Sequence, residues 1–252
     1  MKLRFQITKD KEIRFISHLE YLRTIGRAFR RAKLPVAYSQ GFNPHMKYSL
    51  ASALGVGVVS RAEYVELDLT EPVVPSEAAE ACKKALPRGI RVLAYDAVDD
   101  HAQALMAAAG GAGYRVSVPW QGDFARVEAA VAAFHAAPEL LFEKAAPKTK
   151  KKVKQIDVKR YISRIDVTQE AVTGEGAAEA AARGIRALVF TFDIAITPQG
   201  SMKAVDLLNA LNHAYGLDLP VVLADIERLS LYRTGPAGEH LPMLDNQAMF
   251  KA

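Results

Sequence analysis

The first residues that could contact a ligand are four arginines in one stretch, between residues 15 and 54. Their spacing places them on one side of a helix, opposite an apolar stripe. The four are Arg23, Arg27, Arg30 and Arg31. Guanidinium groups match phosphate oxygens bidentately, so the stripe could hold the phosphates of a nucleic acid. It could equally be a solvated helix face whose arginines pair with carboxylates.

A polar loop, SQGFNPHMK, follows this helix. Its candidate ligand-binding residues are Gln40, Phe42, Asn43, His45 and Lys47. Amides and imidazole can contact base edges, and Phe42 or Tyr48 could stack on a base. The alternative is a structured turn, with Asn43-Pro44 shaping the backbone. The loop is more polar than a turn requires, which favours binding.

Three residues are candidates for acid–base chemistry, namely His18, Tyr38 and His45. Histidine titrates near neutral pH, so His18 and His45 could form a general acid–base pair that cleaves RNA without a metal. For His18 a local hydrogen bond is the simpler expectation, since sequence alone does not fix the distance between the two histidines.

Several chemistries are disfavoured by composition. The single cysteine, Cys82, cannot hold an iron–sulfur cluster or a zinc site, and the histidines lack metal-ligand spacing. No phosphate-loop, dinucleotide or GxSxG motif is present. The sequence therefore favours a non-catalytic role and predicts neither metal nor cofactor in this chain. The net charge of +5 and the lysine run at 148–154 mildly favour an anionic partner such as RNA.

No apolar run is long enough to span a membrane, and the N-terminus lacks the apolar core of a signal peptide. We therefore expect a cytoplasmic protein without a membrane partner.

The order of predicted elements indicates an α+β fold of tandem ferredoxin-like (βαββαβ) units with antiparallel sheets. The best-signalled helix is Ser17–Lys33, with Ser17 as its cap. In the second unit Ser201 is expected to cap a helix, and residues 219–224 to form the closing strand, with 226–231 as its extension. The predicted domains are 1–98 with the basic helix and SQGFNPH loop, a linker 99–112, a second domain 113–233 and a C-terminal tail 234–252.

Three motifs in the first 70 residues, SHL, RAFRRAKLP and YSQGFNPH, resemble the radical-SAM-linked protein family. DVKRYI at 157–162 also fits, whereas Met46 stands where members often have proline. This bacterial family has no determined function, and its members are encoded beside a radical SAM protein or fused to it. The resemblance implies a radical SAM partner. Since this chain has one cysteine, the iron–sulfur cluster and S-adenosylmethionine are expected on that partner.

Three functions stay open. The first is a non-catalytic accessory or substrate-presenting partner of a radical SAM enzyme that binds structured RNA through the basic helix and the loop. The second is a metal-independent RNA-processing enzyme that uses His18 or His45, with Tyr38 nearby. The third is a protein-interaction module whose arginine face docks on an acidic surface of the radical SAM partner.

Overall fold

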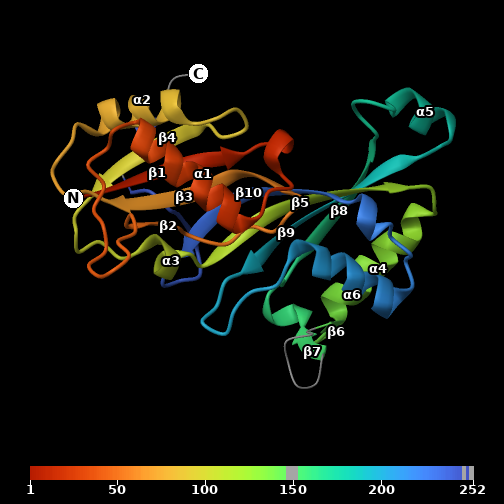
Figure 1. Ribbon diagram of the computed structural model, residues 1–252. Helices are drawn as coiled ribbons and strands as arrows, with labels where there is room; N and C mark the ends of the chain where they lie inside the picture. Colours follow the sequence, from red (N-terminus) through yellow and green to blue (C-terminus); the bar gives the residue numbers. More distant parts are fainter. Residues whose placement is uncertain (146–152, 246–247, 250–252) are drawn as a thin grey trace. The chain divides into compact units, whose positions relative to one another are not determined.

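The computed structural model describes residues 1–145, 153–245 and 248–249. The chain forms two compact units, Met1–Gly110 with Arg228–Ala252, and Gly111–Glu227. Both combine helices with antiparallel strands, as the α+β prediction expects (Figure 1). The domain boundaries differ from those predicted. Residues from 228 onward return to the first unit because β11 pairs with β10 and β12 pairs with β4. The predicted linker, 99–112, includes a short helix, and it belongs to this unit up to Gly110.

The first unit is built on one sheet with the strand order β12-β4-β1-β3-β10, in which β2 also pairs with β3. Its elements are β1 (Lys2–Lys9), η1 (Lys11–Ile13), α1 (His18–Arg31), β2 (Tyr48–Leu50), β3 (Val58–Asp68), α2 (Pro75–Ala85), β4 (Val92–Val98), α3 (Leu105–Ala108), β10 (Asp225–Thr234), β11 (His240–Pro242) and β12 (Ala248–Met249). β1 pairs antiparallel with both β3 and β4. The sheet thus joins strands that are far apart in the sequence.

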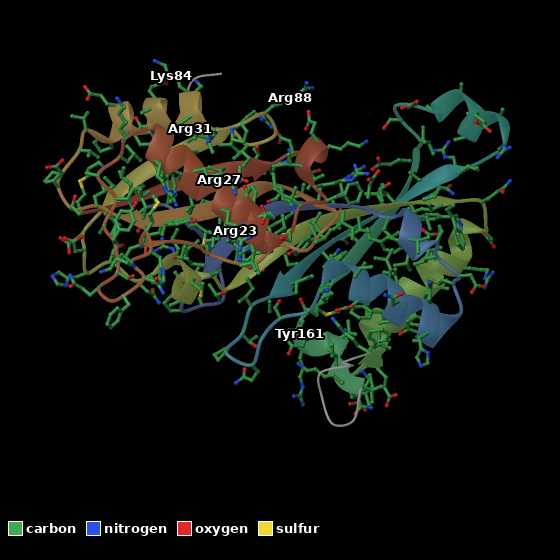
Figure 2. All side chains as sticks on the ribbon, viewed as in Figure 1. Arg23, Arg27, Arg31, Lys84, Arg88 and Tyr161 are labelled. Carbon is green, nitrogen blue, oxygen red and sulfur yellow. The ribbon has the colours of Figure 1, made fainter. Side chains whose placement is uncertain are left out.

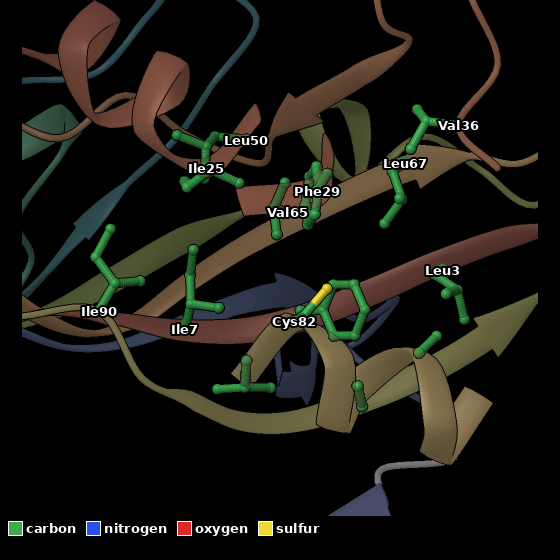
Figure 3. Packing of buried hydrophobic residues seen from close by; sticks show 14 of the residues in the cluster. Leu3, Ile7, Ile25, Phe29, Val36, Leu50, Val65, Leu67, Cys82 and Ile90 are labelled. Atoms are coloured by element: carbon green, nitrogen blue, oxygen red, sulfur yellow. The ribbon is translucent and has the colours of Figure 1, made fainter. Parts of the chain in front are cut away.

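The core of this unit follows from the alternation of residues along β1. Leu3, Phe5 and Ile7 are all buried in it. Ile25 and Phe29 from α1 and Cys82 from α2 belong to the same cluster (Figure 3). Each helix packs an apolar stripe into this cluster, and its opposite side is left for polar residues.

Helix α1 starts as its sequence predicts. The backbone N–H of Glu20 donates to the Ser17 side chain at 3.2 Å, which satisfies one of the N–H groups at the helix start. The helix ends at Arg31, two residues earlier than predicted. Lys33 has left-handed backbone geometry (φ 54°), which stops the helix before Pro35.

In the second unit β5, β9 and β8 pair in that order, and β6 and β7 form a separate hairpin. Its elements are β5 (Gly111–Trp120), α4 (Phe124–Ala136), β6 (Leu141–Ala145), β7 (Val153–Asp157), η2 (Val158–Arg160), β8 (Ile165–Ala171), α5 (Ala177–Ala182), β9 (Arg186–Ala195), α6 (Ala204–Tyr215) and η3 (Val221–Leu223).

Two predictions for the second unit are wrong. Ser201 does not cap α6, because its hydroxyl donates to the carbonyl oxygen of Ala195 at 2.9 Å and the helix begins after Lys203. Residues 219–224 do not form the closing strand. The Asn212 side chain holds Leu219 through two hydrogen bonds, and a 3-10 turn precedes the strand at Asp225.

Candidate nucleic-acid interface

The arginine stripe is exposed along α1, as predicted, while Ile25, Ala28 and Phe29 face the core. Figure 2 shows Arg23, Arg27 and Arg31 following one another along the helix. The cap at Ser17 and the apolar stripe fix the rotation of the helix, so the guanidinium groups point away from the sheet.

The four arginines have different surroundings. Arg23 pairs with Glu20 at 2.5 Å, which balances its charge locally. Arg31 donates from Nε and Nη2 to the carbonyl oxygen of Ala85, at 3.2 and 2.7 Å. Arg30 approaches the sulfur of Met46, with 3.3 Å between Nε and Sδ. Arg27 makes no hydrogen bond or ion pair with any residue in the described ranges, so its guanidinium group is available to a ligand.

The Arg31 contact brings the C-terminal end of α1 beside the end of α2 and adds two cations that sequence reasoning missed. Lys84 lies in the last turn of α2, and Arg88 follows it (Figure 2). Arg88 approaches Glu12 at 3.6 Å, whereas Lys84 has no ion pair within the described part of the chain. We call Arg27, Arg30, Arg31 and Lys84 the basic face. The lysines in the last turn of α2 are visible in the sequence, but only the packing of the two helices shows that this turn lies beside the arginines of α1.

The loop after α1 is a tight hairpin, here called the polar hairpin (residues 36–47). Isolated bridges join Val36 to Leu69 and Tyr38 to Met46, and the structure has no regular strand between α1 and β2 in this described segment. Ser39 and His45 close the tip: the Ser39 N–H donates to the His45 carbonyl at 2.8 Å, and the His45 N–H donates to Ser39 Oγ at 3.0 Å. The loop is thus a structured turn that also presents side chains to solvent.

All the predicted ligand-binding residues of the polar hairpin are exposed. They are Gln40, Phe42, Asn43, His45 and Lys47, together with Tyr38. Phe42 has a relative exposure of 107%, as high as in an extended peptide. Of the hairpin residues only Val36 and Met46 are buried, and they anchor it on the core.

Tyr48 attaches the end of the hairpin to α1. Its hydroxyl donates to the Leu22 carbonyl at 3.1 Å, and its ring meets Phe29 edge-on at 5.7 Å. Burial raises the pKa of Tyr48, and the nearby Arg30 charge partly offsets this. Gly26 permits the approach, because a Cβ there would lie 2.4 Å from Tyr48 Oη. Tyr48 therefore anchors the hairpin on α1, and its stacking on a base stays a prediction.

The geometry separates the two candidate catalytic histidines. His18 is the first residue of α1, whereas His45 precedes Met46, which contacts Arg30 near the other end. Positions 18 and 30 lie roughly 18 Å apart along the helix axis. An acid–base pair between His18 and His45 is therefore excluded in this conformation, since such a pair needs hydrogen-bonding distance. Nδ1 of His18 is buried and finds no hydrogen-bond partner among the described residues, so the expected local bond is not formed there.

A second charged cluster in the first unit is buried. Arg228 donates from Nη1 to Glu63 Oε1 at 2.9 Å, and Ser60 donates to the same oxygen at 2.7 Å. Lys9 Nζ donates to the carbonyls of Arg14 and Ile16, at 2.9 and 3.1 Å. Burial lowers the pKa of Lys9, and the Glu63 carboxylate opposes this shift. These bonds fix the segment that enters α1, which gives the cluster a structural role.

The remaining sequence candidates concern metals, the thiol and the lysine run. Within residues 1–145, 153–245 and 248–249, no three histidine, cysteine or carboxylate side chains gather as metal ligands. Cys82 is buried, and burial raises the pKa of its thiol to about 12. Residues 148–152 of the lysine run lie outside the described residues. Among the helices of the described chain, none has the length and apolar character to cross a membrane.

These features define a mixed α+β protein with mostly antiparallel sheets and an exposed basic helix. The chain belongs to the family described as "uncharacterized protein conserved in bacteria (DUF2344)", whose family model matches residues 2–203. No curated protein matches the chain. Its structure is similar to a chain from the "Crystal Structure of a Cbf5-Nop10-Gar1 Complex", with a TM-score of 0.44 and 12% sequence identity. The match covers 94% of this chain and 50% of that one, so this chain spans half of its length. A likeness at this level carries no conclusion about function.

Proposed function

We propose that this protein binds structured RNA through the basic face and the polar hairpin, as a non-catalytic accessory or substrate-presenting partner of a radical SAM enzyme. One observation carries the RNA-binding part. The basic face and Lys47 present five cations without a carboxylate partner in the described chain, next to a hairpin rich in exposed amide, imidazole and aromatic groups. Such a surface suits phosphates beside accessible bases.

The radical SAM part rests on the sequence resemblance alone. In this proposal S-adenosylmethionine and the iron–sulfur cluster belong to the partner, and this chain presents the RNA. The test is to look for a radical SAM protein encoded beside this chain and to co-purify the two. Iron and the absorbance of the iron–sulfur cluster should be found in the fractions that contain the partner. Failure of the two proteins to form a complex would contradict the radical SAM part of the proposal and leave the RNA-binding part untouched.

The proposal also includes the finer fold, tandem ferredoxin-like units. It is supported in the first unit by the strand order β4-β1-β3-β2, with α1 and α2 in the two connections. In the second unit β5, β8 and β9 with α4 and α6 follow a similar sequence of elements. An experimental structure of each unit tests this assignment.

RNA binding is tested by measuring affinity for a panel of structured RNAs at several salt concentrations. The wild-type affinity should fall steeply with salt, because phosphate contacts release counterions. We expect the double variant R27A/R30A to bind more weakly and to lower the salt slope by about one for each phosphate that is no longer neutralised. R164A/R183A removes two exposed arginines of the second unit and is the charge-matched control. Equal affinities for the two double variants would refute the assignment of the site.

The two alternatives predict different results. An RNA-processing enzyme should cleave RNA alone, but the separation of His18 and His45 removes the paired mechanism and leaves each histidine to act singly. A protein-docking module should lose its partner on arginine substitution and show no RNA affinity. A pull-down with and without nuclease, read for both RNA and protein, separates these results.

A further inference from the structure

Among the residues that the structure describes, Phe42 is the most exposed large apolar side chain, and the fold does not account for it. Phe15, another exposed aromatic, lies under the guanidinium group of Arg14 at 4.8 Å. Phe42 has no ring or cation contact with any other residue of the described chain. A phenylalanine held fully in water contributes nothing to the core, so its ring is free to meet a ligand.

The hairpin that carries Phe42 is held firmly below its tip. The Lys47 N–H donates to the Ala37 carbonyl at 2.8 Å, the Ala37 N–H donates to the Asp68 carbonyl at 2.8 Å, and the Asp68 N–H donates to the Lys47 carbonyl at 3.0 Å. Gly41 precedes the ring with a φ of 132°, a conformation that other residues rarely adopt. The ring is thus presented from an ordered support, which lowers the entropy cost of binding.

The groups around the ring suit a nucleobase. The side chains of Gln40, Asn43 and His45 are exposed and make no hydrogen bond with a described residue, so their donors and acceptors can contact base edges. Lys47 and Arg30, at the base of the hairpin, supply cations for the adjoining phosphates. Bases paired within an RNA helix cannot reach a side chain in this way, whereas unpaired bases can be splayed out and stacked.

From this we infer that Phe42 stacks on an unpaired base of the bound RNA while the basic face holds the adjoining phosphate backbone. The ligand class is therefore an RNA with a single-stranded loop, bulge or end beside a stem. This inference rests on the proposed RNA binding and adds the kind of RNA and the residue that recognises it.

The experiment uses the full-length chain and a stem–loop RNA with the fluorescent base 2-aminopurine, placed either in the loop or in the stem. Wild type should quench the loop probe much more than the stem probe. F42L should weaken binding of the stem–loop by roughly 5- to 150-fold, the range for one base stacked on an aromatic ring. F42Y keeps the ring and should restore both affinity and quenching. The salt slope should be unchanged in F42L and lower in R27A, because of these two side chains only that of Arg27 contacts phosphate.

Each outcome has one meaning. The stacking inference would be overturned if F42L bound the stem–loop as tightly as the wild type does. It would also be overturned if F42L bound the stem–loop and a blunt duplex more weakly by the same factor. Either result would leave the proposed RNA binding intact. Loss of binding to the radical SAM partner in F42L, with RNA affinity kept, would also overturn the stacking inference. No RNA binding by wild type would overturn both proposals. Because Phe42 is fully exposed, its variants should have the same melting temperature as the wild type.

Discussion

A Gly26→Ala substitution tests how the polar hairpin is attached to α1. Alanine is normally the better helix former, by about 1 kcal/mol. Here its Cβ would lie 2.4 Å from Tyr48 Oη and 2.8 Å from Cζ, distances at which something must shift. The Tyr48 ring cannot yield freely, because its hydroxyl is bonded to the Leu22 carbonyl and its edge packs on Phe29.

The magnitude follows from three effects. Overpacking a fitted contact costs about 1–3 kcal/mol. Displacing the Tyr48 hydroxyl from Leu22 costs roughly another 1 kcal/mol. The higher helix propensity of alanine stabilises the folded chain by about 1 kcal/mol and offsets part of these costs. We therefore expect G26A to lower the free energy of unfolding by about 1–3 kcal/mol, although it improves the intrinsic helix.

The decisive measurement is a double-mutant cycle with Tyr48→Ala, read by urea unfolding. In the absence of the Tyr48 ring, the only remaining effect of G26A is the higher helix propensity of alanine. G26A should therefore stabilise the Y48A protein by up to about 1 kcal/mol. A reversal of sign between the two backgrounds is the expected result. Equal destabilisation in both backgrounds would show that the contact with Tyr48 is not the cause. Stabilisation of the otherwise wild-type chain would refute the close approach itself.

Three further predictions concern stability. Burial raises the pKa of the Cys82 thiol from 9.0 to about 12. Above pH 9 the thiol therefore loses its proton in the unfolded chain before it does so in the folded chain, and the free energy of unfolding falls as the pH rises. C82A should reduce that fall by about 1.4 kcal/mol at pH 10, as measured from unfolding curves at pH 8 and 10. Glu63→Gln removes the carboxylate charge opposite the buried Arg228 and should cost about 3–5 kcal/mol in urea unfolding. Arg31→Ala should cost about 1 kcal/mol because its bonds to the carbonyl at the end of α2 are removed, whereas R27A should change the same measurement by less than about 0.5 kcal/mol.

The sequence predicts well what depends on neighbouring residues. The cap at Ser17, the apolar and basic sides of α1 and the polar loop all follow from local patterns, and the structure has them. It does not predict contacts between distant segments. Arg228 meets Glu63 across 165 positions, and no pattern in either segment marks the pair. The return of the C-terminal strands to the first unit escapes prediction for the same reason, because strand pairing depends on the whole sheet.

The arginine stripe shows how packing decides the use of residues that look equivalent in the sequence. Arg31 holds the end of α2 and Arg23 pairs with Glu20, so Arg27 and Arg30 carry most of the charge that a ligand can meet beside the hairpin. The place of that hairpin depends in turn on Gly26, a residue that need not touch the ligand. G26A should therefore weaken RNA binding by misplacing the hairpin, with Phe42 and Lys47 on it, while the phosphate contact of Arg27 is kept. R27A removes that phosphate contact, which lowers the salt slope, and leaves the hairpin in place. The two variants separate geometry from charge at one site.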